Sequence, residues 1–135
     1  MVYNLFISHS WSYSDEYERL VNLLDNSGLY YKNYSIPFDD PVHNARNKAE
    51  LIDAIWDKMA YASCVLILAG VYSTYSEWIN IEIDLALNGF YRPKKIIAIE
   101  PYGSERTSSV VKDAADIIVR WNTNSIVNAI IELCG

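Results

Sequence analysis

The run Ser63-Cys64-Val65-Leu66-Ile67-Leu68-Ala69 consists almost entirely of apolar side chains. A short, continuous apolar run of this kind is typical of a parallel strand whose two faces are both covered by helices. The run therefore predicts a buried strand in the middle of an α/β sheet.

Strand and helix patterns alternate on both sides of this run. Four further strands are predicted at residues 2–8, 29–35, 95–100 and 116–121. The helices between them are predicted from about residue 14 to Gly28, after Asn47, from 77 to Gly89, at 108–113 and after Asn122. In the second helix, one face is formed by Ile52, Ile55, Trp56 and Met59. Strands separated by helices indicate parallel pairing with right-handed crossovers. We therefore predict a three-layer, flavodoxin-like fold with strand order 2-1-3-4-5 and helices on both faces, whose ligands bind at the carboxyl ends of the strands.

Composition limits the classes of function. The 135 residues fit one domain spanning 1–135, and no apolar run approaches the roughly 20 residues that a membrane span requires. The first residues begin directly with a strand pattern and lack the basic start of a signal peptide. The net charge of −6 argues against a nucleic-acid partner.

The two cysteines and two histidines suggest no metal site. Cys64 and Cys134 lie in apolar patterns, so we expect two small buried side chains that form neither a disulfide framework nor a metal site. His9 and His43 lack a second ligand at metal-binding spacing. These features favour the reducing cytoplasm and a protein without a metal or a bound cofactor.

One carboxylate in the third predicted helix falls on an unexpected side. At 100° per residue, the polar residues Glu77, Asn80, Asp84 and Asn88 gather in one arc, whereas Glu82 lies on the opposite side, near Trp78. A carboxylate among apolar side chains loses hydration at a cost of several kcal/mol unless it is paired or protonated.

Two interpretations of this pattern remain open. Glu82 is either a functional carboxylate in a cleft or a rim residue whose head reaches water or a lysine. Trp78 is correspondingly either an aromatic wall beside the carboxylate or an ordinary core residue.

Taken together, several motifs resemble the TIR family, and more closely its prokaryotic branch that includes the ThsB proteins of Thoeris antiphage defence. The resemblance covers essentially the whole chain. It rests on Phe6-Ile7-Ser8-His9-Ser10, on Val65-Leu66-Ile67-Leu68 and on Tyr75-Ser76-Glu77-Trp78-x-x-x-Glu82-Ile83. The spacing Trp-x-x-x-Glu is the most specific of these elements.

The resemblance implies an activity and a site. Enzymatic TIR domains cleave the nicotinamide–ribose bond of NAD+ and then hydrolyse or cyclise the product. By resemblance, Glu82 is the catalytic residue with Trp78 beside it, and the loops after the first two strands border the nucleotide. The residues that match those loops are Ser8, His9, Ser10, Trp11, Phe38, Asp39 and Asp40. The resemblance thus implies NAD+ as a substrate, self-association as a way to complete the site, and a product that signals to a partner effector.

Two other functions stay open beside this one. A nucleoside deoxyribosyltransferase-like enzyme would use the same sheet with a glutamate that faces an anomeric carbon. A non-catalytic TIR module would only bind other TIR domains and would need no glutamate on an apolar helix face.

Overall fold

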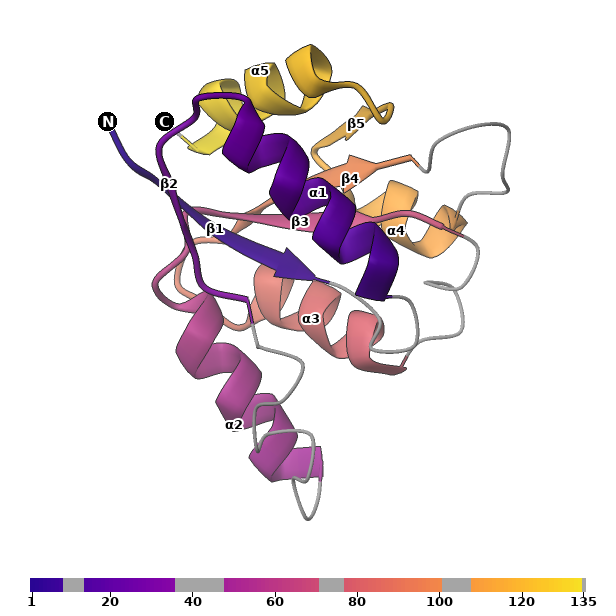
Figure 1. The fold of residues 1–135 in the computed structure, drawn as a ribbon. Coiled ribbons are helices and arrows are strands. Elements are labelled where there is room, and N and C mark those ends of the chain that lie inside the picture. Colours follow the sequence, from indigo (N-terminus) through magenta and orange to yellow (C-terminus); the bar gives the residue numbers. More distant parts are fainter. Residues whose placement is uncertain (9–13, 36–47, 71–76, 101–107, 135) are drawn as a thin grey trace.

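The computed structural model describes residues 1–8, 14–35, 48–70, 77–100 and 108–134 (Figure 1). The strands are β1 (Tyr3–Ser8), β2 (Tyr31–Asn33), β3 (Cys64–Leu68), β4 (Lys95–Ile99) and β5 (Ile117–Val119). The helices are α1 (Ser14–Asn26), α2 (Lys48–Met59), α3 (Glu77–Asn88), α4 (Ser109–Ala114) and α5 (Thr123–Cys134).

The five strands form one parallel sheet in the order β2-β1-β3-β4-β5, which confirms the predicted fold. β3 lies at the centre, and all five of its residues are buried, as its apolar run predicted. The edge strands β2 and β5 have only three residues each and are shorter than predicted. Backbone pairing nevertheless continues just outside β2, because Tyr3 N donates to Tyr30 O and Tyr34 N donates to Leu5 O.

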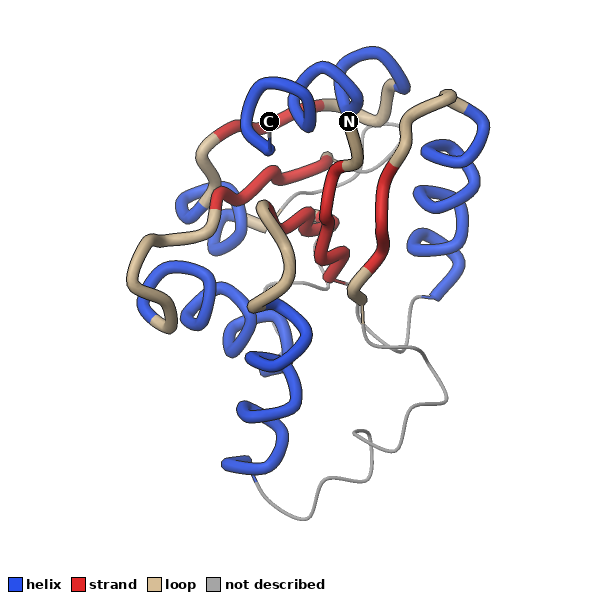
Figure 2. The backbone as a smooth tube through the Cα atoms, turned by 90° about the vertical axis from the view of Figure 1, so that its left-hand side faces the viewer, coloured by secondary structure: helices blue, strands red, loops and turns tan. Residues whose placement is uncertain are grey.

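Helices cover both faces of the sheet and make two apolar layers (Figures 1 and 2). α1 and α5 pack on one face, where their Leu20, Leu24, Ile126 and Ile130 meet Leu66 and other inward strand residues. α2, α3 and α4 pack on the other face. That layer contains Phe6, Ile55, Met59, Val65, Ile67, Ile79, Ala86, Ile96 and Val111. The three inner strands β1, β3 and β4 thus send alternate side chains into opposite layers.

Local signals in the sequence account for several helix ends. The chain leaves α1 through Gly28, whose φ of +84° lies in the left-handed region that favours glycine. Ser108 caps α4, and its Oγ accepts a hydrogen bond from Val111 N at 3.4 Å. Before α5, Asn122 Oδ1 accepts from Ser125 N at 3.0 Å.

The apolar face predicted for α2 is only partly buried. Ile55 and Met59 are fully buried, but Trp56 is 40% exposed. Its indole stacks on Phe90 with ring centroids 5.2 Å apart, and Nε1 donates to Gly89 O at 2.9 Å. Trp56 therefore joins α2 to the end of α3 at the surface rather than filling the core.

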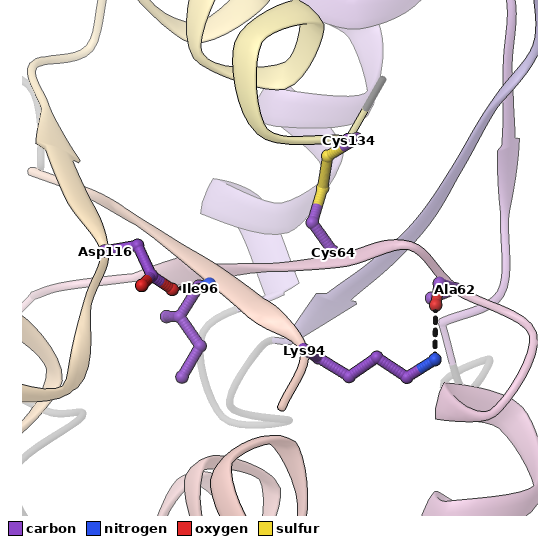
Figure 3. Close-up of a disulfide and its surroundings, with 6 residues drawn as sticks. All are labelled: Ala62, Cys64, Lys94, Ile96, Asp116 and Cys134. Carbon is purple, nitrogen blue, oxygen red and sulfur yellow. Dashed lines mark hydrogen bonds between the residues drawn. A yellow bond between two sulfur atoms is a disulfide. The ribbon is translucent and has the colours of Figure 1, made fainter. Parts of the chain in front are cut away.

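Cys64 and Cys134 form a disulfide, so the expectation that they would not pair is wrong (Figure 3). The expectation that both are buried is right, since they are 0% and 9% exposed. Their positions are 70 residues apart in the sequence, but α5 packs back across the sheet and its last residue reaches the start of β3. The two Cα atoms are 5.6 Å apart, within the usual range for a disulfide. Sequence separation alone did not reveal this proximity.

Within the described residues, the helices are all too short or too polar to cross a membrane.

Candidate functional site

The candidate site lies at the carboxyl edge of the sheet. β1 ends there at Ser8, and α1 and α3 begin at the same edge (Figure 1). Parallel α/β sheets bind ligands at this edge, where the connections after neighbouring strands diverge to opposite faces. Here the neighbours are β1 and β3, which are followed by helices on opposite faces of the sheet.

The helix α3 buries Glu82 and exposes its other described polar side chains. Glu82 is 1% exposed. Asn80, Asp84 and Asn88 are exposed, and Asn88 Nδ2 donates to Asp84 Oδ1 at 2.9 Å. This confirms the helical projection and excludes a rim position in which the carboxylate reaches water.

Backbone contacts of α3 place Glu82 along the layer. Ala86 O accepts a hydrogen bond from Lys94 N at 2.8 Å, so Ala86 lies level with the start of β4. Glu82 precedes Ala86 by four residues and is therefore about 6 Å nearer the carboxyl edge. Side chains on a helix lean towards its N-terminus, which in α3 is the end at the carboxyl edge of the sheet. The carboxylate is thus directed towards the ends of β1 and β3.

Ser8 lies on the same face of the sheet as α3. Phe6 belongs to the apolar layer beneath α3, and Ser8 follows it by two residues, so both side chains point to that face. Ser8 is 1% exposed and pairs in register with Ile67 of β3. Its Oγ makes no hydrogen bond with any residue that the structure describes. Ser8 Oγ and Glu82 Oε2 are therefore two buried polar atoms in one largely apolar layer.

The other predicted site residues are not placed. His9, Ser10, Trp11, Phe38 and Asp39 lie outside the described residues. The backbone of Trp78 forms part of the first turn of α3, but its side chain is likewise outside the description. Their roles remain predictions.

The orientation of Ser8 is the part of the site that the sequence analysis missed. Ser8 was predicted to border a nucleotide only by resemblance, without a prediction for the direction of its hydroxyl. The alternation of Phe6 and Ser8 in the first strand was a sufficient signal, because side chains two residues apart share a face.

A lysine at the opposite end of the layer has a structural role. Lys94 Nζ donates to Ala62 O at 2.7 Å (Figure 3). It also donates to Ala60 O at 3.3 Å and lies 4.7 Å from the centre of the Phe90 ring. Partial burial lowers the pKa of Lys94 below its usual value. Its ammonium group holds the chain that follows α2, at the amino edge of the sheet.

The arrangement of Glu82 has a definite chemical capacity. A carboxylate held in a water-excluded layer interacts with a nearby positive charge more strongly than it would in bulk water. If a substrate develops that charge only in its transition state, the carboxylate lowers the reaction barrier.

The fold of the chain is similar to that of several solved α/β domains. The SEFIR domain of interleukin-17 receptor B superposes with a TM-score of 0.59 at 10% identity, covering 98% of this chain and 95% of that one. A CMP N-glycosidase of Clostridium botulinum, BcmB, gives 0.56 at 14% identity over 96% and 98%. A prokaryotic SEFIR domain gives 0.50 at 17% identity over 96% and 94%. These likenesses concern the fold.

The sequence itself identifies the family. A family model described as "Thoeris protein ThsB, TIR-like domain" matches residues 6–106. The chain therefore belongs to the family of ThsB TIR-like domains. The match includes Ser8, Trp78 and Glu82. No curated protein matches the chain significantly in sequence.

Proposed function

We propose that this TIR-like domain is an enzyme that cleaves the bond between nicotinamide and ribose in NAD+, with Glu82 as its catalytic residue. The observation that carries the proposal is the 1% exposure of Glu82 on a helix whose other described polar residues face solvent. Membership of the ThsB TIR-like family supports the choice of NAD+ as substrate.

The chemistry suits a single buried carboxylate. As the C1′–N bond of NAD+ breaks, its electron pair moves to the nicotinamide nitrogen and positive charge develops on the ribose C1′. Nicotinamide leaves as a neutral molecule, so this step needs no general acid. Glu82 stabilises the sugar cation, and either water or a nitrogen of the adenine ring then bonds to C1′. Water gives ADP-ribose and a proton, and the ring nitrogen gives a cyclised product.

The remaining predicted residues supply binding. In this proposal Ser8, His9, Ser10, Trp11, Phe38 and Asp39 border the nucleotide, and Trp78 forms the wall beside the carboxylate. Self-association completes the site, and the product acts as a signal for a partner effector during antiphage defence.

The test compares the loss of the buried carboxylate of α3 with the loss of an exposed carboxylate of the same helix. NAD+ is incubated with the wild-type protein, with Glu82→Gln and with Asp84→Asn, over a series of protein concentrations because activity is expected to require self-association. We expect the wild type and Asp84→Asn to release nicotinamide equally, and Glu82→Gln to be slower by about 100-fold or more. Products are resolved by mass spectrometry. Equal release by Glu82→Gln, with unchanged circular dichroism, would exclude Glu82 as the essential group.

A second candidate substrate is a pyrimidine nucleotide. The Clostridium botulinum neighbour is titled a CMP N-glycosidase, and that reaction also breaks a bond between C1′ and a base nitrogen. CMP and deoxynucleosides therefore belong in the same assay. Base release from CMP or a deoxynucleoside without cleavage of NAD+ would replace the proposed substrate. A protein that self-associates but cleaves none of these compounds would instead be a non-catalytic TIR module.

A further inference from the structure

Four polar side chains are buried among the described residues: Ser8, Ser35, Glu82 and Ser108. Ser35 and Ser108 each have a structural role in the fold. Ser35 Oγ accepts a hydrogen bond from Ile7 N at 2.9 Å and donates one to Asn33 Oδ1. Ser35 lies just beyond the end of β2, and its hydroxyl thus provides an acceptor for a backbone amide of β1. Ser108 Oγ accepts from Val111 N as the cap of α4.

Among the described residues, nothing gives the hydroxyl of Ser8 a comparable structural role. Its hydroxyl is buried but makes no hydrogen bond with the described residues, and a buried hydroxyl in that state lowers the stability of a fold. Its surroundings on this face are apolar, since Phe6, Ile67 and Ala69 belong to the same layer. The nearby amide of Ala69 is already used, because it donates to Ile99 O at 2.8 Å.

We propose that Ser8 is a specificity-determining residue whose Oγ hydrogen-bonds one hydroxyl group of the sugar that faces Glu82. This inference rests on the proposed function and adds the recognition of a ribose over a deoxyribose. A serine hydroxyl both donates and accepts, as a sugar hydroxyl does, so the two groups are complementary. A phosphate is disfavoured as the partner, because the carboxylate of Glu82 in the same layer would repel its charge.

The chemistry of the layer explains why the contact would discriminate strongly. A site that buries a polar group for a substrate hydroxyl rejects the analogue lacking it, because its own group then remains without a hydrogen bond. Ser8 is the last residue of β1 and its register with β3 is fixed, so its backbone and the face to which its side chain points are set before the substrate arrives.

The first test measures stability and needs no activity. Ser8→Ala, Ser35→Ala and Ser108→Ala are compared by urea unfolding of the full chain. We expect Ser8→Ala to unfold at the same urea concentration as the wild type or a higher one, since it removes a hydroxyl that the fold does not use. Ser35→Ala and Ser108→Ala should unfold at lower concentrations. A loss in Ser8→Ala as large as that in Ser35→Ala would overturn the inference, because the hydroxyl would then be structural.

The second test measures recognition in the absence of turnover. Calorimetric titrations compare NAD+ with analogues that lack the 2′- or the 3′-hydroxyl of the nicotinamide ribose, using Glu82→Gln and the double variant Ser8→Ala/Glu82→Gln. We expect one analogue to bind Glu82→Gln at least about tenfold more weakly than NAD+. The double variant should bind NAD+ and that analogue equally.

The outcomes separate this inference from the proposed function. Binding of NAD+ with the same discrimination in both proteins, or with none in either, would overturn the role of Ser8 and leave NAD+ as the substrate. Failure of the wild type and of both variants to bind NAD+ would overturn the proposed function and this inference together.

Discussion

Two carboxylates on α3 show how the position of one residue decides its environment. Glu82 and Asp84 are separated by two residues, which is about 200° around the helix. Asp84 is exposed and accepts a hydrogen bond from Asn88, whereas Glu82 is enclosed by the layer under the helix. Both variants proposed for the NAD+ assay turn a carboxylate into an amide. A difference in activity between Glu82→Gln and Asp84→Asn would therefore come from where each carboxylate lies, not from the kind of substitution.

Tyr31 offers a prediction about pH. Its hydroxyl donates to Asp25 Oδ1 at 2.6 Å, and burial, followed by this hydrogen bond, raises the pKa of Tyr31 well above the usual 10.0. Above pH 10 the unfolded chain loses this proton first, so the free energy of unfolding falls as pH rises. Below pH 10 the contribution is fully present.

Urea unfolding at about pH 8 and about pH 11 checks this prediction. We expect the wild type to lose more stability across this range than Tyr31→Phe, which cannot ionise at position 31. Tyr91→Phe is the control, because Tyr91 is 100% exposed and should follow the wild type. Parallel curves for the wild type and Tyr31→Phe would contradict the prediction.

At the scale of elements, the sequence predicted the order and kind of every strand and helix in the described residues. Periodicity was sufficient because each helix has one or more buried faces and the central strands are apolar throughout. Edge strands were harder: β2 and β5 are only three residues long, and the Tyr-rich pattern of 29–35 did not mark where regular pairing stops. The surface position of Trp56 was also missed, because its partner Phe90 lies beyond the end of another helix.

The site was predictable to a smaller extent. The burial of Glu82 followed from the helical projection, since a single angle decides it. The inward direction of Ser8 needed the strand alternation to be applied at the last residue of β1. The connections that carry His9, Trp11 and Asp39 have no periodicity from which a side-chain direction could be predicted.

The contacts that Lys94 makes with the residues following α2 and α3 yield a second prediction. The ammonium group of Lys94 donates hydrogen bonds to Ala60 O and Ala62 O, which follow α2, and it lies over the ring of Phe90, which follows α3. Lys94→Met keeps an unbranched, flexible side chain but removes the ammonium group and both of its hydrogen bonds. We expect the free energy of unfolding to fall by about 1 kcal/mol, measured by urea unfolding at neutral pH.

Lys95→Met is the matched control for Lys94→Met. Lys95 is the next residue and is exposed, so its loss should change stability little. If Lys94→Met and Lys95→Met were equally stable, the contacts of Lys94 with the α2 end would contribute nothing measurable.

At the scale of the whole molecule, the disulfide ties the C-terminal helix to the central strand. Cys64 begins β3 and Cys134 ends α5, so the bond closes the C-terminal half of the chain, from β3 to α5, into one covalent loop. Ile126, Ala129 and Ile130 already hold α5 in the apolar layer above the sheet. The bond therefore adds to an existing packing interface, and its reduction should leave the native topology intact.

The expected consequence of reduction is a loss of stability without a loss of fold. A cross-link between positions 70 apart restricts the unfolded chain, and the chain-entropy estimate for a loop of that length is about 4 kcal/mol. Urea unfolding with and without dithiothreitol should differ by up to that amount, while far-ultraviolet circular dichroism stays the same. Cys64→Ala/Cys134→Ala should be as stable as the reduced wild type and should not respond to reductant. Free alkylation of both cysteines in denatured protein that was never reduced would show that the bond is absent. Protection of both, with the mass expected for loss of the two thiol hydrogens, would establish it.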